Sequence, residues 1–306
     1  MKIFLKTLAC FLLLLLAVYG LTYGRFLYKM NSYSLEIPKE KTVLLIGESQ
    51  SQAAVDDSKI QNLYNSSQAQ DRYLSMYCRL KALLDVNSQI DTVIISLTPH
   101  SINRGKDDFW TMGGYIRQNV QTYGALLGPE EWMLMFRHAP ELTLAEIVTP
   151  LRYYWEVDET YMSKYGSFSA ADYCALQANI EEGATSLKVF PSFGNSVSLH
   201  YLDKMIKLCE ERDIKVIALN TPVYQAWKYE EPQYYYDYLS QTYPDLELWD
   251  YLDADIPDDY RRDINHLNKK GAEWFTKEII DRLFLSNKDM QSEIHKPCVE
   301  LVLGGK

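Results

Sequence analysis

The chain has 306 residues, of which 47% are hydrophobic and 24% are charged, and its formal net charge is −10. This length and composition are typical of one large globular domain, or two small ones, with a sizeable core. Acidic residues outnumber basic ones by 41 to 31, which argues against general nucleic-acid binding, because nucleic acids bind a basic face.

The N-terminus has the pattern of a membrane anchor. Lys2 and Lys6 come at the start of an apolar run that extends to about residue 23 and contains five consecutive leucines. The run is long enough to cross a bilayer, and no small-x-small cleavage site follows it. We therefore expect residues 1–30 to form an uncleaved signal anchor, a single transmembrane helix in the cytoplasmic membrane. A short basic N-terminus normally stays inside, which places the large domain on the extracytoplasmic side.

Beyond the anchor, residues 31–40 predict a short stalk, with Pro38 near its end. The chain then alternates between apolar runs, typical of buried strands, and segments with apolar residues three and four apart, typical of helices. This alternation indicates a parallel sheet with helical connections. Strands are expected near residues 43–46, 60–65, 91–97, 215–220 and 246–250, and helices near residues 71–87, 199–209 and 269–284.

The alternating segments belong to residues 41–285, which we expect to form an α/β domain, a three-layer sandwich with a mostly parallel five-stranded sheet. Residues 101–196 interrupt the pattern and are rich in Trp, Tyr, Met and Gly. We interpret them as an insertion of short helices and loops. It forms either a lid or substrate wall over the carboxyl edge of the sheet, or an extra helical layer away from any site. Residues 286–306 are polar and predict a poorly ordered tail.

A serine follows the first predicted strand, in the sequence Gly47-Glu48-Ser49. Open α/β sheets bind ligands at the carboxyl ends of their strands, so Ser49 stands where a nucleophile would be useful. We expect Gly47 to allow a tight turn, and the Ser49 N–H to face negative charge that forms beside the hydroxyl. Taken alone, a Gly-x-Ser sequence more often marks a helix cap than a nucleophile.

Asp263 and His266 stand three residues apart in a loop before the last predicted helix. At this spacing the carboxylate can accept the Nδ1 proton of the imidazole, which leaves Nε2 free to act as a base. With Ser49 at the same edge of the sheet, these residues predict a Ser-His-Asp triad and an acyl-enzyme step. Ser51 is the competing nucleophile, and we expect it to have turned into the helix.

These two motifs resemble those of the SGNH (GDSL-type) hydrolases, and especially membrane-anchored bacterial cell-surface members such as the DltD-like and alginate-acetylation proteins. The first family block is Gly-Asp-Ser, here Gly47-Glu48-Ser49, and the last is Asp-x-x-His, here Asp263-Ile264-Asn265-His266. The resemblance covers residues 41–100 and 197–285. It implies a flavodoxin-like SGNH fold and a serine esterase or O-acyltransferase.

The resemblance also implies an oxyanion hole built by the second and third family blocks. The glycine of the second block would fall at Ser66-Ser67, where the Ser67 backbone N–H is a candidate donor beside that of Ser49. The asparagine of the third block is missing after the third strand, and His100 or Asn103 is the candidate replacement. One such donor contributes about 3 kcal/mol to the transition state, so its absence would make a slow enzyme.

The remaining residue types predict no cofactor and no metal site. There is no His-Glu-x-x-His or comparable cluster, and no close pair among the five cysteines suggests a disulfide framework. Cys78 and Cys209 fall on helix faces that are expected to be buried. His200 has no evident carboxylate partner, and Arg261 and Arg262 are expected in a solvated loop rather than in a site for an acidic ligand.

Two classes of function remain. The first is a cell-envelope serine esterase or O-acyltransferase that acts on O-acyl groups, acetyl above all, of polysaccharide. Its partners would be the acylated polysaccharide or an acyl donor, the membrane, and a membrane-bound O-acyltransferase. The second is a non-catalytic envelope protein that retains the fold for binding or assembly. Glu48 in place of Asp and the missing asparagine favour the second class, whereas the three triad residues favour the first.

Overall fold

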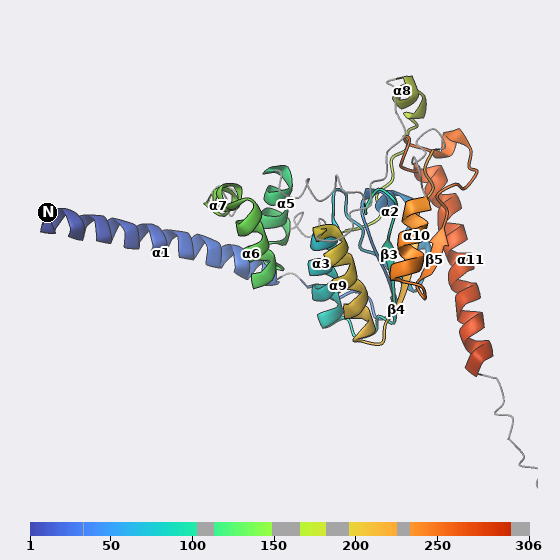
Figure 1. Ribbon diagram of the computed structural model, residues 1–306, viewed down its shortest axis with the longest axis horizontal. Coiled ribbons are helices and arrows are strands. Elements are labelled where there is room, and N and C mark those ends of the chain that lie inside the picture. Colours follow the sequence, from blue (N-terminus) through green and yellow to red (C-terminus); the bar gives the residue numbers. More distant parts are fainter. Residues whose placement is uncertain (33, 103–112, 149–165, 182–195, 225–232, 295–306) are drawn as a thin grey trace, which may run out of the picture.

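The computed structural model describes residues 1–32, 34–102, 113–148, 166–181, 196–224 and 233–294. They form an α/β domain from which a long N-terminal helix projects (Figure 1). The strands are β1 (Val43–Ile46), β2 (Leu63–Asn65), β3 (Thr92–Ser96), β4 (Lys215–Asn220) and β5 (Glu247–Asp250). The helices are α1 (Lys2–Ser32), α2 (Ser49–Ala54), α3 (Tyr73–Val86), α5 (Gly113–Tyr123), α6 (Pro129–His138), α7 (Pro140–Val148), α8 (Leu176–Glu181), α9 (Val197–Glu210), α10 (Gln233–Thr242) and α11 (Lys269–Ile294).

The five strands form one sheet in the order β2-β1-β3-β4-β5. Every pairing between them is parallel, and Leu45 on β1 aligns with Asn65 on one side and Ile94 on the other. The predicted five-stranded sheet is therefore confirmed, with all of its strands parallel. The chain winds outward from β1 in both directions, so the carboxyl ends of β1 and β3 border the crevice where sheets of this kind bind ligands.

Helices cover both faces of the sheet, because successive residues of a strand point to opposite faces. Leu44 and Val93 belong to a core with side chains of α3, α9 and α10. Leu45 and Ile94 belong to a second core with side chains of α2 and α11. Figure 1 shows α3 and α9 on one side of the strands and α11 on the other. Each fully buried Leu or Ile contributes about 1.5–3 kcal/mol, so these cores hold the strand ends in place.

Two predicted boundaries are wrong. The expected stalk is docked on the domain: α1 continues to Ser32, and Ile37 is buried, with its N–H donating to Asn87 Oδ1 at 2.9 Å. At the other end, α11 continues through Ile294 and takes in the first part of the predicted tail. The rest of that tail, residues 295–306, lies outside the described residues.

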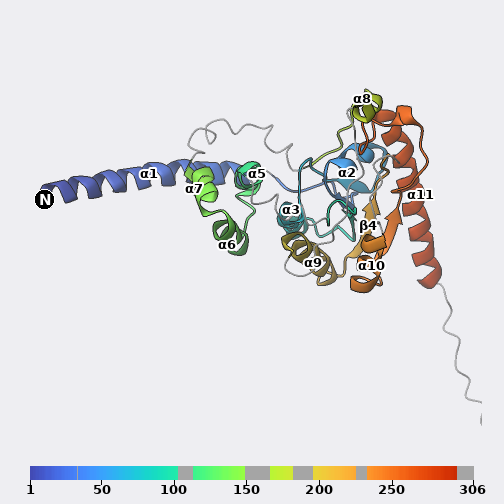
Figure 2. The same cartoon turned by 45° about the horizontal axis from the view of Figure 1, so that its top comes forward.

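The insertion has two parts with different positions. Helices α5, α6 and α7 form a helical layer near α1 and α3 (Figures 1 and 2), where Arg72, the residue just before α3, donates to Tyr115 OH on α5 at 2.7 Å. Residues 166–175 and α8 instead lie at the carboxyl edge of the sheet. The described part of the insertion thus contains a helical layer and a separate segment at the edge of the sheet.

Within the described residues, α1 is the one helix that is long and apolar enough to cross a membrane. The candidate span runs from Lys2 to Arg25, has a mean hydropathy of 2.3 and is 0% buried in the protein. Its length and composition fit a single membrane crossing.

Candidate active site

Ser49 is the first residue of α2, and two residues, Gly47 and Glu48, separate it from the end of β1. Gly47 is needed there for a reason that differs from the predicted tight turn, because its φ is not in the left-handed region. A Cβ at Gly47 would meet the Ser51 hydroxyl and would lie 2.5 Å from the Ser96 Cβ. Glycine therefore allows the close approach of β1, α2 and β3 that positions Ser49.

The three residues of the predicted triad are hydrogen-bonded to one another. His266 Nε2 lies 2.8 Å from Ser49 Oγ, and His266 Nδ1 lies 2.8 and 3.0 Å from the two carboxylate oxygens of Asp263. The His266 and Asp263 side chains are only 12% and 18% exposed. With the Nδ1 proton donated to Asp263, Nε2 is free to accept the hydroxyl proton of Ser49, which is the geometry that a general base requires.

The Asp263 carboxylate is held by several donors besides the imidazole. Oδ1 accepts the backbone N–H groups of Asn265 at 3.0 Å and His266 at 2.9 Å, and Oδ2 accepts Arg262 Nε at 2.7 Å. Burial opposes ionisation, but the contacts with His266, Arg262 and the backbone outweigh it and hold the pKa of Asp263 well below its usual value. The carboxylate therefore stays charged and can stabilise an imidazolium.

We expect Asp263 to make the free energy of unfolding depend on pH in the acid range. Because the pKa is lower in the folded chain, the carboxylate stabilises the fold above the unfolded value of about 4. This contribution is lost as the pH falls toward the lowered folded pKa. Asp263→Asn lacks this ionisation and should lose less stability over that interval. Denaturant unfolding of both proteins between about pH 6 and pH 3 measures the difference, and parallel curves would contradict the assignment.

Ser51 is fully buried and does not reach the position of a nucleophile. Its Oγ lies 3.0 Å from the Glu48 carbonyl oxygen and 2.9 Å from Ser67 Oγ. Ser51 has turned into the helix, as expected.

The oxyanion hole is where the structure departs most from the expectation. The Ser67 backbone N–H already donates to the buried Asn65 Oδ1 at 2.9 Å, so the expected donor is engaged elsewhere. His100 is half-buried in the turn after β3, and Asn103 lies outside the described residues. The Ser49 N–H remains, since the first N–H groups of a helix have no acceptor within the helix.

Two buried side chains that the sequence analysis did not single out lie at the same edge of the sheet. Gln50 follows Ser49, and Ser96 ends β3; they are 3% and 1% exposed. Gln50 Nε2 and Ser96 Oγ have no hydrogen-bond partner in the described structure. Burying such a group unpaired costs about 1–3 kcal/mol, and both atoms are shielded from solvent, so a bound substrate would reach them only after a neighbouring group moved. No sequence signal identifies them, because Gln and Ser occur throughout the chain.

Glu48 stands where the resembled family has Asp. Its side chain is 7% exposed, and its carboxylate lies 3.7 Å from Arg72 Nη1. Glu48 therefore pairs with the residue that precedes α3, and Asp263 is the carboxylate that holds His266.

Residues 166–175, which we call the strap, cross the carboxyl edge of the sheet beside the triad. Their backbone bonds to the end of β2, to α2, to the loop that carries His266 and to the start of α11. These bonds are Ser167 N to Ser67 O (3.2 Å), Ser169 N to Gln52 O (3.0 Å), Ala175 N to Arg262 O (2.5 Å) and Lys269 N to Ala171 O (2.9 Å). The strap ties together the segments on either side of Ser49 and His266.

We expect Gly166→Ala to displace the strap. Gly166 has a φ of +101°, and an added Cβ would meet the carbonyl group of Ser66 and lie 2.8 Å from its Cα. The free energy of unfolding should fall by about 1–3 kcal/mol, and Ser49 should be acylated more slowly. Gly24→Ala, whose Cβ would meet nothing within 4 Å, is the control. The midpoint of thermal unfolding and the acylation rate of Ser49 are measured for both variants. If neither quantity changes in Gly166→Ala, the strap has no role in stability or in acylation.

The arginines beside the triad are not in a solvated loop, which corrects the prediction. Arg261 is 2% exposed, its guanidinium lies 5.5 Å from the ring centroid of Tyr224, and burial lowers its pKa. Arg262 binds Asp263, and Tyr224 N donates to Ile264 O at 2.8 Å. These contacts fix the loop that presents Asp263 and His266.

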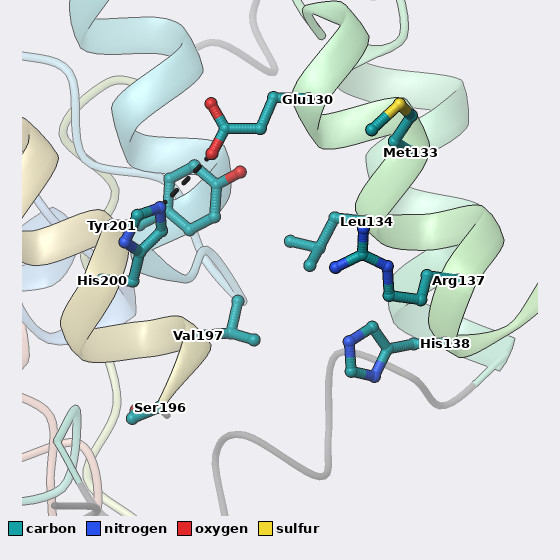
Figure 3. Close-up of a pocket in the computed structure, with 9 residues that line it drawn as sticks. All are labelled: Glu130, Met133, Leu134, Arg137, His138, Ser196, Val197, His200 and Tyr201. Atoms are coloured by element: carbon teal, nitrogen blue, oxygen red, sulfur yellow. Dashed lines mark hydrogen bonds and ion pairs between the residues drawn. The ribbon is translucent and has the colours of Figure 1, made fainter. Parts of the chain in front are cut away.

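A cleft of about 540 Å³ lies between α6 and α9, lined by residues other than the triad (Figure 3). His200 Nε2 lies 3.3 Å from Glu130 Oε1 across this cleft, so His200 has a carboxylate partner that the sequence did not reveal. Both side chains are more than half exposed, and such pairs contribute about 0–1 kcal/mol. Among the described residues, no group of three or more His, Cys, Asp or Glu could hold a metal ion. Cys78 and Cys209 are buried, as expected.

Comparison with known proteins assigns no function to the site. A model of an uncharacterised protein family matches residues 179–287, which is less than half of the chain. The matched range contains Asp263 and His266 and leaves out Ser49. No curated protein and no solved structure matches the chain.

Proposed function

We propose that the protein is a membrane-anchored serine esterase or O-acyltransferase of the cell envelope. Its substrates would be O-acyl groups, acetyl above all, of polysaccharide. The observation that carries the proposal is the contact of Ser49 Oγ with His266 Nε2 at 2.8 Å, with Asp263 bound to the other ring nitrogen at 2.8 Å. A serine hydroxyl is too weak an acid to attack an ester unaided and needs a base within about 3 Å.

In the proposed reaction, His266 Nε2 takes the hydroxyl proton as Ser49 Oγ attacks the ester carbonyl. Asp263 stabilises the imidazolium and keeps its own charge. The Ser49 N–H receives the negative oxygen. The bond to the leaving alcohol then breaks, the alcohol takes the proton from His266, and the acyl group stays on Ser49. In the second half of the reaction, an acceptor attacks the acyl group on Ser49, with His266 again as the base. The acceptor is water in an esterase and a sugar hydroxyl in a transferase.

The arrangement of the elements supports the resemblance to SGNH hydrolases. Ser49 follows β1 and the loop with Asp263 and His266 precedes α11, the positions of the first and last family blocks. The strand order is the flavodoxin-like one. For acyl transfer, a membrane-bound O-acyltransferase is the partner that would supply the acyl group.

The full-length protein treated with an activated acetyl ester, such as p-nitrophenyl acetate, tests the proposal. Mass spectrometry should find one acetyl group on the peptide that contains Ser49. Rapid quenching in acid preserves the acyl-enzyme, because a serine ester is stable there. Acetylation confined to lysines and the N-terminus would contradict the proposal.

One observation favours the alternative, a non-catalytic envelope protein that retains the fold for binding or assembly. The Ser67 N–H is bonded to Asn65 and is not available as an oxyanion donor. Such a protein would bind acetylated polysaccharide without acylation of Ser49. Affinity measurements on the acetylated and deacetylated polymer, run beside the acylation assay, separate the two functions.

We place the domain on the extracytoplasmic side of the cytoplasmic membrane. The short segment before the apolar run carries Lys2 and Lys6, and basic ends of this kind stay in the cytoplasm. Protease added to spheroplasts should remove the domain while a cytoplasmic control protein survives. Survival of both would show the opposite orientation.

A further inference from the structure

The helical layer of the insertion packs on the part of α1 that the proposed anchoring places in the membrane. Tyr19 OH donates to the Ile147 carbonyl on α7 at 2.9 Å. Tyr19 and Tyr23 also line a cavity of about 290 Å³ together with Trp132 on α6. Tyr19 lies inside the candidate span Lys2–Arg25. Figures 1 and 2 both show α7 beside the C-terminal half of α1.

The place of Tyr19 along α1 sets the depth of this contact. Tyr19 comes about six residues before Arg25, the charged end of the span, which is roughly 9 Å along a helix axis. A bilayer has a hydrocarbon core of about 30 Å, and tyrosines gather at its interfaces, with the ring in the apolar zone and the hydroxyl near the headgroups. The end of α7, bonded to Tyr19, therefore lies at the depth of the membrane interface.

The same layer exposes large apolar side chains on two consecutive helices. Met133 and Phe136 on α6 are 60% and 41% exposed, and Leu142 and Leu144 on α7 are 42% and 56% exposed. Phe136 lines the cavity that Tyr19 and Tyr23 of the span also line, whereas Met133 borders the cleft between α6 and α9. Leu142 and Leu144 lie on the helix whose end binds Tyr19, so exposed apolar side chains of both helices lie close to the span. Helix α7 is too short to cross a bilayer.

We propose that α6 and α7 are seated in the membrane interface as a second attachment of the domain, beside α1. Lipid covers Phe136 and the exposed leucines of α7, because Phe136 and Ile147 border Tyr19 and Tyr23 of the span. This inference rests on the proposed anchoring. The segment after α1 is docked on the domain through Ile37. The membrane therefore holds the domain at two places, through α1 and through α6 and α7. Ser49 is then kept at a fixed height above the bilayer instead of moving on a flexible stalk.

The test uses depth-dependent fluorescence quenching of the full-length protein in lipid vesicles. Cys10, Cys174 and Cys298 are replaced by serine, and one new cysteine is labelled with the fluorophore NBD. The labelled variants are Leu144→Cys on α7, Leu14→Cys in the anchor and Lys277→Cys on α11, all of them at exposed positions. Lipids that carry a doxyl quencher at shallow or deep positions on the acyl chain report the depth of each probe.

Quenching is expected at position 144 by shallow doxyl groups and at position 14 by deep ones, with none at position 277. Quenching at position 14 but not at position 144 would refute the location of α7 in the membrane interface while supporting the anchor. The exposed apolar side chains would then be covered by a protein partner. No quenching at 14 would overturn the anchor and this inference together. Circular dichroism of each labelled variant shows that the helices are intact.

Discussion

Ser49→Ala is expected to lose acylation at the active-site peptide and to reduce ester turnover by roughly 10⁴–10⁶-fold. The reason is that Ser49 Oγ is the hydroxyl at 2.8 Å from the proposed base, while Ser51 is fully buried. Removing the nucleophile ends the covalent route, and any remaining rate comes from binding and electrostatic stabilisation. Single-turnover acylation with p-nitrophenyl acetate, followed by mass spectrometry, measures the loss.

Two serine variants make the Ser49 result specific. Ser240→Ala changes an exposed side chain on α10 and should leave acylation unchanged. Ser51→Ala removes the buried contact with Ser67 and should cost about 1 kcal/mol of stability while Ser49 still labels. A Ser49→Ala protein that labels as well as the wild type would defeat the mechanism.

Asp263→Asn is expected to lower kcat by about 10³–10⁴-fold while the fold and Ser49 remain intact. An amide can present its N–H₂ to Nδ1, which stabilises the tautomer with the proton on Nε2. That tautomer cannot accept the hydroxyl proton of Ser49. KM should change little, because Asp263 acts through His266 and does not face the substrate. Steady-state kinetics on the activated ester separate these two quantities.

Asp259→Asn is the matched control for this variant. It makes the same chemical change in the turn just before the triad loop, at a carboxylate that is 61% exposed and paired with Lys270 at 3.0 Å. Its kinetics should equal those of the wild type. If Asp263→Asn retained wild-type kcat, His266 would not depend on the carboxylate, and the triad would be wrong.

The sequence by itself determined the strands, the main helices and the residues of the triad. Runs such as Val43–Ile46 and Thr92–Ser96 are buried on both faces, so their apolar pattern follows directly from the sheet that they form. Asp263 and His266 are three residues apart in one loop, so their hydrogen bond depends only on the local backbone. The contact with Ser49 follows from a topological rule, because the carboxyl ends of parallel strands meet at one edge.

Only the tertiary structure decided how the site is lined. The strap is held by backbone hydrogen bonds, and Gly166 is fixed by the backbone of Ser66, contacts that leave no periodic pattern in the sequence. Ser67 N–H is engaged because a particular side chain, Asn65, is within reach. Arg261 is buried in part because the segment after β4 brings Tyr224 over its guanidinium. Each outcome depends on which distant segment lies nearby in space, whereas sequence spacing reports only on neighbours within the same strand, helix or loop.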